Sequence, residues 1–267
     1  MRIRKLFYCW LTTTLSLPKR EMKPRLRGKT IVIDTGTPTS HFKDVVESHS
    51  HIIDGIKFGW GTALVTQHLQ TKICILRNAG IPFYLGGTLF EKYVLERKFQ
   101  EFQQLLMDIG PDYVEVSNGS IDLTDSEKSV YVRKLASHFN VISEIGKKEN
   151  ENAKGMNPCE WVDAIRSDLD SGATLVTLET RSNGKGGFCL PNGELRHDVV
   201  ERILDANINL DTLLFEAPST YLQSYFIKRI GPHVNLGNIK MDDIVSLETL
   251  RLGLRFETLF FPFQNEE

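Results

Sequence analysis

Carboxylates recur in this 267-residue chain where short apolar runs end. Glu115, Glu144 and Glu179 occupy equivalent places in three successive runs. If these side chains met in one mouth they would repel one another and raise each other's pKa, unless a cation lay among them. A hard divalent ion with oxygen ligands meets that need. We therefore predict Mg²⁺ bound by Glu115 and Glu144, with Glu179 as a third ligand and Asp34 as the alternative to it. A helix cap or a salt bridge is the other interpretation for any single acid.

Cationic and amide side chains occur at the same kind of position. Lys147 follows Glu144 by three residues. A lysine beside a metal and other cations can have its pKa lowered enough to transfer a proton. We assign that role to Lys147 in preference to Lys148, and we add Lys57 and Arg181 to the catalytic set. The predicted substrate-binding residues are Asp34, Gly87, Thr88, Asn118, Lys185, Glu216, Asn235 and Asn238.

Glycine clusters near three of these run ends could offer backbone N–H groups to an anion at a helix start. They are Gly59-Trp60-Gly61, Gly86-Gly87 and Gly184-Lys185-Gly186. Glycine also simply makes tight turns, so each cluster alone says little. Together with Arg181, Lys185 and Arg255 they indicate an anionic, phosphorylated substrate.

Eight apolar runs are the elements that must position these residues. They span 31–34, 52–59, 81–87, 113–118, 141–146, 174–179, 213–216 and 234–238. The runs are too short for helices and are rich in β-branched and aromatic residues, which is typical of strands buried on both faces. Segments with helical spacing separate them, as at Phe99, Phe102, Leu105, Leu106 and Ile109.

This alternation predicts an α/β protein with a single (β/α)₈ TIM barrel, which brings all strand carboxyl ends to one catalytic face. An open doubly wound sheet is the alternative. The first strand is not followed by a GxGxxG turn that would cradle a dinucleotide.

The first 29 residues differ from the rest of the chain. Arg2, Arg4 and Lys5 precede a short apolar stretch, in the outline of a secretory signal, but no A-x-A-like cleavage site follows. Residues 19–29 are basic and contain Pro24 and Gly28. We expect residues 1–29 to be an extension and connector lying over one end of the barrel, and residues 30–267 to form the catalytic barrel.

The composition narrows the classes of molecule that this protein could bind. The 32 basic and 34 acidic residues give a formal charge of −2, without the basic excess of a nucleic-acid-binding protein. The four cysteines lack CxxC spacing, which favours free thiols in the reducing cytoplasm. No stretch approaches the roughly 20 apolar residues that span a bilayer. The sequence does not fix the oligomeric state, and a homo-oligomer is one of the alternatives.

Several strings at the run ends resemble the phosphosulfolactate synthase family, in order from about Lys23 to Thr258. They are Lys57-Phe58-Gly59-Trp60-Gly61-Thr62, Gly86-Gly87-Thr88-Leu89-Phe90-Glu91, Glu115-Val116-Ser117-Asn118-Gly119, Glu144-Ile145-Gly146-Lys147-Lys148, Phe215-Glu216-Ala217-Pro218, Val234-Asn235-Leu236-Gly237-Asn238-Ile239 and Ser246-Leu247-Glu248-Thr249-Leu250-Arg251. The resemblance implies a (β/α)₈ barrel that uses Mg²⁺ to add sulfite to phosphoenolpyruvate, through a metal-stabilised enediolate, and gives phosphosulfolactate of (2R) configuration. In archaea this reaction opens coenzyme M biosynthesis. The implied acid that protonates the substrate is Lys147, with Glu115 and Glu144 on the metal.

Three departures from the family pattern bear on activity. The first run ends Asp34-Thr35-Gly36, where the family usually has a lysine between the acid and the glycine. The usual Arg-Glu-Ser-Gly becomes Arg181-Ser182-Asn183-Gly184, and only Gln223 remains of a glutamine-rich stretch. Besides a working synthase, two alternatives stay open. One is a relative that acts on another enol acid or nucleophile, and the other is a non-catalytic barrel with a stress-related interaction role.

Overall fold

The computed structural model describes residues 4–5, 12–146, 156–180, 186–190 and 192–263. Within them, eight parallel strands close into a barrel in the order β10-β3-β4-β5-β6-β7-β8-β9. The strands are β3 (Thr30–Asp34), β4 (Gly55–Phe58), β5 (Phe83–Leu85), β6 (Tyr113–Val116), β7 (Asn140–Ile145), β8 (Ala173–Leu178), β9 (Leu213–Glu216) and β10 (Leu236–Ile239). Each lies within or next to one of the eight apolar runs. The (β/α)₈ prediction is confirmed.

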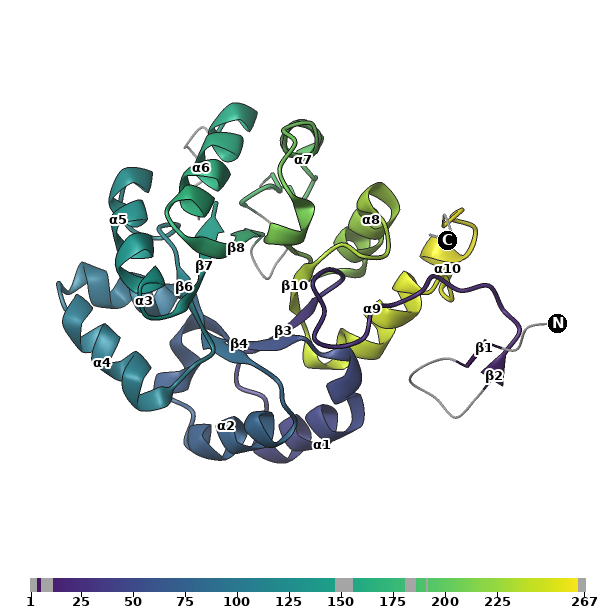
Figure 1. Ribbon diagram of the computed structural model, residues 1–267, viewed down its shortest axis with the longest axis horizontal. Helices are drawn as coiled ribbons and strands as arrows, with labels where there is room; N and C mark the ends of the chain where they lie inside the picture. The colour runs from purple at the N-terminus through teal and green to yellow at the C-terminus, as the bar shows by residue number, and fades with distance from the viewer. Residues whose placement is uncertain (1–3, 6–11, 147–155, 181–185, 191, 264–267) are drawn as a thin grey trace.

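Helices surround the strands (Figure 1). They are α1 (Thr39–His49), α2 (Leu69–Asn78), α3 (Gly87–Leu95), α4 (Phe99–Ile109), α5 (Asp125–Ala136), α6 (Pro158–Asp170), α7 (His197–Leu204), α8 (Thr220–Ile230), α9 (Ile244–Arg251) and α10 (Phe256–Leu259). Short 3₁₀ turns cover Ser50–Ile52, Gly59–Leu64, Leu210–Thr212 and Met241–Asp243. Capping boxes begin two helices, from Thr124 and Glu127 at α5 and from Asn157 and Glu160 at α6. These caps fix where the chain turns back from the strand ends.

Side-chain alternation along the strands divides the protein into an outer and an inner core. Alternate residues such as Val114, Val141 and Val176 point outward and join the large core between strands and helices. The inward residues form a separate small cluster, namely Ile31, Tyr84, Ile142, Leu175 and Leu214, with Tyr113 against it. On four strands the inward residue two positions further along is polar, namely Glu115, Glu144, Thr177 and Glu216, whereas β3 carries Ile33. The apolar cluster therefore fills the amino end of the barrel, and the inner layer toward the carboxyl ends of β6 to β9 is polar.

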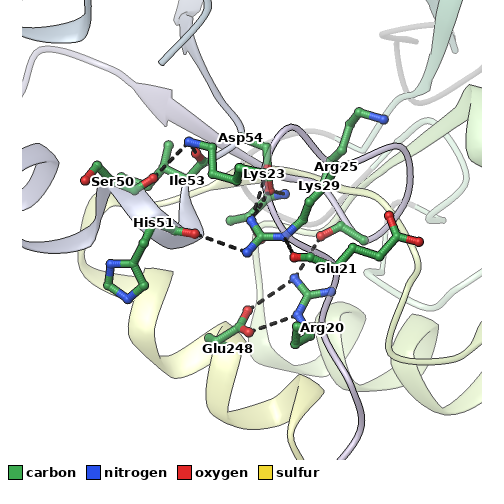
Figure 2. Close-up of polar contacts among 12 residues, drawn as sticks. Arg20, Glu21, Lys23, Arg25, Lys29, Ser50, His51, Ile53, Asp54 and Glu248 are labelled. Carbon is green, nitrogen blue, oxygen red and sulfur yellow. Dashed lines mark hydrogen bonds and ion pairs between the residues drawn. The ribbon is translucent and has the colours of Figure 1, made fainter. Parts of the chain in front are cut away.

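The basic connector before β3 is bound to the amino end of the barrel (Figure 2). Lys23 Nζ donates to the main-chain oxygens of Ser50 (2.9 Å) and Ile53 (2.5 Å). Arg25 Nη1 contacts both carboxylate oxygens of Asp54, at 3.0 and 3.1 Å. Arg20 lies 2.9 Å from Glu248 in a buried ion pair. These cations are therefore used to hold the connector in place.

Two further features of the described residues bear on the partner predictions. Cys74, Cys159 and Cys189 are free thiols, and Cys9 lies outside the described residues. None of the described helices combines the length and the apolar character that crossing a membrane requires. Two antiparallel strands of two residues each, β1 (Arg4–Lys5) and β2 (Thr12–Thr13), precede the connector.

Candidate active site

Four buried ionisable residues meet inside the barrel toward the carboxyl ends, and we call Lys57, Glu115, Glu144 and Glu216 the acid cluster. Lys57 Nζ lies 2.9 Å from Glu115 Oε2, 3.1 Å from Glu144 Oε2 and 3.3 Å from Glu216 Oε1. The residues come from β4, β6, β7 and β9 and are all at least nine-tenths buried. Period-two alternation explains the convergence, since Glu115, Glu144 and Glu216 each follow an inward apolar residue by two positions.

Burial and mutual repulsion control protonation in the acid cluster. Burial raises the pKa of Glu216 to about 7; the attraction of Lys57 opposes that rise, while Glu144 and Glu115 add to it. The pKa of Glu115 is raised by the same burial, although Lys57 draws it down. Burial alone would lower the pKa of Lys57, yet the three carboxylates hold it well above its usual range. Lys57 is therefore a fixed cation, and among the carboxylates Glu216 exchanges its proton near neutral pH.

Tyr84 forms the floor of the acid cluster. Its side chain belongs to the inner apolar layer, and burial followed by the negative charge of Glu115 raises the pKa of its phenol well above the usual range. The hydroxyl therefore stays protonated and supplies a neutral polar group below the acids. Tyr84 was not among the predicted site residues, and its inward register two residues before Gly86 was the only indication that the sequence offered.

The first turn of α3 orients Glu115. The Gly87 N–H donates to Glu115 Oε2 at 2.6 Å, so this helix start binds a carboxylate of the protein itself. A Cβ at Gly87 would lie 2.4 Å from Ser117 Oγ, which explains why only glycine fits here. Thr88 is the second residue of the same helix. The Gly87 N–H is thus used by Glu115, and the predicted binding of a substrate anion at this helix start stays a prediction.

Glu179 follows β8 directly, beside the end of β7. It is buried, and a Cβ at Gly146 would come within 2.7 Å of Glu179 Cβ. Gly146 also has a φ of +141°, which L side chains rarely adopt. Gly146 therefore allows the ends of β7 and β8 to approach closely, and Glu179 lies against the Gly146 backbone.

Asp34 and Asn118 make contacts within the protein frame. Asp34 Oδ2 lies 2.5 Å from Lys72 Nζ of α2, and its Oδ1 accepts the N–H groups of Gly36 and Thr37. Asn118 Nδ2 donates to the Leu123 oxygen at 2.8 Å and to Asp125 at 2.9 Å. These two side chains hold the loops after β3 and β6. Their predicted contact with substrate stays a prediction.

Asn238 and Gln223 are polar groups near the ends of β10 and β9. Asn238 has a φ of +54°, and its buried Oδ1 has no hydrogen-bond partner in the described part of the chain. Gln223 Nε2 donates to the Ala217 oxygen at 3.1 Å. A left-handed, buried asparagine with an unused acceptor is the kind of strained feature that clusters at functional sites.

The structure does not support the predicted substrate-site roles of Asn235 and Arg255. Asn235 precedes β10, so it lies at the amino end of the barrel, where it accepts the Lys29 N–H and donates to the oxygens of Asp211 and Leu213. The substrate-binding prediction for Asn235 was wrong because position 235 was counted among the strand ends, whereas β10 begins only at Leu236. Arg255 follows α9 and pairs with Glu257 at 2.9 Å, so its contacts are local.

Three predicted residues, Lys147, Arg181 and Lys185, lie outside the described residues. Two buried lysines that the sequence analysis passed over, Lys72 and Lys128, lie on the inward faces of α2 and α5. Their helical spacing from apolar residues was the available indication, as in Lys128, Val132 and Leu135.

The donor chemistry of the acid cluster suits a hard cation. Among the residues that the structure describes, no three His, Cys, Asp or Glu side chains form a ready-made metal site. Mg²⁺ is often held by only one or two carboxylates, with substrate and water completing its shell. Glu115 fits such a site, because its buried Oε1 has no hydrogen-bond partner among the described residues.

A closed parallel barrel with a buried lysine among carboxylates at its carboxyl end defines this protein as a (β/α)₈-barrel enzyme. The profile of the (2R)-phospho-3-sulfolactate synthase (ComA) family matches residues 18–257. The chain therefore belongs to the phosphosulfolactate synthase family.

Relatives of known name support this membership. A phosphosulfolactate synthase of Bacillus subtilis (strain 168) is 44% identical over 247 residues, covering 92% of this chain and 98% of that protein. One of Methanothermobacter thermautotrophicus is 37% identical, covering 91% of this chain and 95% of its own length. The Arabidopsis thaliana protein HEAT-STRESS-ASSOCIATED 32 is 22% identical over 236 residues, covering 78% of this chain and 79% of its own length.

Solved structures show the same fold. A 3-hexulose-6-phosphate synthase superposes with a TM-score of 0.51 at 14% identity, covering 83% of this chain and 97% of that one. The YdjI aldolase from Escherichia coli K12 gives 0.53 at 12% identity, covering 84% and 85% of the two chains. At such identities the likeness concerns the barrel alone.

Proposed function

We propose that this protein catalyses the Mg²⁺-dependent addition of sulfite to phosphoenolpyruvate, giving (2R)-phospho-3-sulfolactate. The observation that carries the proposal is the acid cluster, in which Lys57 contacts three buried carboxylates. These acids stand in strings that resemble the family, in a chain 44% identical to a relative named as a phosphosulfolactate synthase.

Charge balance supports a divalent cation. The acid cluster contains three carboxylates and one ammonium group, while phosphoenolpyruvate and sulfite are both anions. Bringing these anions to the cluster would be strongly unfavourable without further positive charge. Glu115 and Glu144 would hold Mg²⁺, with Glu179 as a third ligand. When bound, the ion supplies Lewis-acid stabilisation of the charge that develops on the substrate carboxylate.

The reaction is a net addition across a carbon–carbon double bond. The sulfur lone pair of sulfite forms the new bond to C3 of phosphoenolpyruvate, and the π electron pair moves to C2 and its carboxylate. A proton then adds to C2, so atoms and electrons balance without an oxidant or a reductant. Lys147 is the proposed proton donor, and delivery from one face sets the configuration.

Other residues of the proposed site would bind and orient the substrate. Arg181 and Lys185 would pair with the phosphate and carboxylate groups, and Thr88 at the start of α3 would add a donor. Asn238 would offer its unused amide oxygen. Lys57 keeps the surrounding carboxylates in fixed positions, which preserves the geometry that addition requires.

We place the enzyme in a reducing, cytoplasmic compartment. Three free thiols support this, namely Cys74, Cys159 and the buried Cys189. Burial raises the pKa of the Cys189 thiol to about 11, so it stays protonated and unreactive.

Two neighbouring lysines allow a matched test of the mechanism. Lys147→Ala should abolish product formation while Mg²⁺ binding and thermal unfolding stay unchanged. Lys148→Ala, which removes the same charge one residue further on, should retain most of the activity. Turnover would be followed by liquid chromatography and mass spectrometry of phosphosulfolactate. Unchanged turnover in Lys147→Ala would remove this lysine from the mechanism.

A further inference from the structure

A second cluster of buried polar residues lies on the outer side of the barrel wall, directly behind Glu144. Lys128 Nζ of α5 is 2.7 Å from Asp168 Oδ2 of α6. Ser143 Oγ of β7 donates to the same carboxylate oxygen at 2.6 Å. Lys128 Nζ also donates to the main-chain oxygen of Glu144 at 3.1 Å. All of these residues are at least nine-tenths buried.

Packing alone does not require this group. Lys128 occupies the inward face of α5 with Val132 and Leu135, where an apolar side chain would fill the space. Taking an ammonium and a carboxylate out of water is costly, and apolar replacements of buried ion pairs are often as stable or more so. The feature that an apolar pair could not reproduce is the hydrogen bond from Lys128 to the Glu144 carbonyl.

That hydrogen bond fixes the carboxyl end of strand β7. Ser143 and Glu144 are consecutive residues, and each is bound to the Lys128–Asp168 pair, one through its side chain and one through its carbonyl. With the peptide after Glu144 held from outside, its carboxylate is held inside the barrel, 3.1 Å from Lys57 Nζ. The next residues, Ile145 and Gly146, lead to Lys147.

We infer that Lys128 and Asp168 are positioning residues for Glu144, acting through the β7 backbone from outside the barrel. The inference rests on the proposed function, in which Glu144 is a ligand of the catalytic cation. Removing outer partners of metal ligands typically lowers affinity or activity about 10- to 100-fold. A loss of that size in kcat, with little change in KM, is expected on loss of Lys128.

Lys128→Met alone leaves Asp168 buried without its cation, so it could fail through instability. The decisive variant is therefore Lys128→Met with Asp168→Leu, which removes both charges together. We expect thermal unfolding to recover toward the wild-type value while kcat stays about 10- to 100-fold low. Recovery of kcat together with stability would overturn the inference, because it would show a purely structural role.

A matched control exists at the other end of the barrel. Arg20 and Glu248 form a similarly buried ion pair there, 2.9 Å apart. Arg20→Met with Glu248→Leu should leave kcat at the wild-type level once the protein is folded. A kcat loss in this control equal to that in the Lys128 and Asp168 double variant would also overturn the inference.

Failure of the proposed function would be recognised separately, since the wild-type protein would then form no phosphosulfolactate. In that case a crystal structure of the Lys128 and Asp168 double variant decides. Displacement of the Glu144 carboxylate from Lys57 supports positioning, and a carboxylate that stays at the wild-type distance of 3.1 Å contradicts it.

Discussion

Lys57→Met tests the electrostatics of the acid cluster most sharply. In the wild type, this ammonium group faces Glu115, Glu144 and Glu216 inside the barrel. Methionine has a similar volume but no charge, so the variant buries one more uncompensated negative charge. The cheapest relief for the folded protein is to take up one additional proton on a carboxylate.

The cost of that proton depends on pH. Protonating a carboxyl above its ordinary pKa costs about 1.4 kcal/mol for each pH unit. On folding, the variant thus takes up one proton more than the wild type does, so its stability falls more steeply than that of the wild type as pH rises. Between about pH 5.5 and about pH 8 the stability deficit of Lys57→Met relative to wild type should grow by about 3 kcal/mol.

Urea unfolding measures this directly. Trp161 is buried, with 1% of its surface exposed, so its fluorescence should report the loss of structure. The free energy of unfolding would be measured for wild type and variant at both pH values. The double variant Lys57→Met with Glu216→Gln removes the ammonium group together with the carboxyl whose pKa is raised to about 7. It should then take up as many protons on folding as the wild type does, so its deficit should change far less with pH. An equal deficit for Lys57→Met at both pH values would refute the reasoning.

Three further predictions concern single positions. The pKa of Glu216 is raised to about 7 by burial, so its neutral form stabilises the fold below the ordinary carboxyl pKa of 4.5, and this contribution is lost as pH rises through 7. In the wild type this should lower the free energy of unfolding by about 3 kcal/mol between pH 4.5 and pH 7, and Glu216→Gln should not show this decline. The measurement is Tm against pH for both proteins, and an undiminished decline in the variant would contradict the prediction. Gly87→Ala should cost about 1–3 kcal/mol and lower kcat, because its Cβ would meet Ser117 Oγ and disturb the N–H donated to Glu115; wild-type kinetics would argue against that contact. Asn235→Ala should cost about 2–4 kcal/mol in denaturant unfolding but leave KM unchanged, since its hydrogen bonds lie at the amino end; a raised KM would return Asn235 to the substrate site.

The barrel was predictable because its strands are buried on both faces and its helices on one. That difference produces short continuous apolar runs and longer periodic segments, which the sequence displays directly. The carboxylates at Glu115, Glu144 and Glu216 were also predictable, since acids rarely enter buried strands without a function.

The partners of these acids could not be predicted from local patterns. Lys57 was expected among the catalytic residues, but its contacts to three acids depend on which strands are neighbours across the barrel. Lys72 and Lys128 were missed because a lysine in a helix usually faces water. Their partners Asp34 and Asp168 lie 38 and 40 residues away along the chain. Only the closed barrel brings such pairs together.

The acid cluster is proposed to serve the Mg²⁺-dependent addition of sulfite to phosphoenolpyruvate. The most direct measurement incubates the purified protein with both substrates, with Mg²⁺ and with a chelator, and detects the product by mass spectrometry. We predict phosphosulfolactate in the presence of Mg²⁺ and its loss with the chelator. A folded protein that forms no phosphosulfolactate and does not bind phosphoenolpyruvate would contradict the claim.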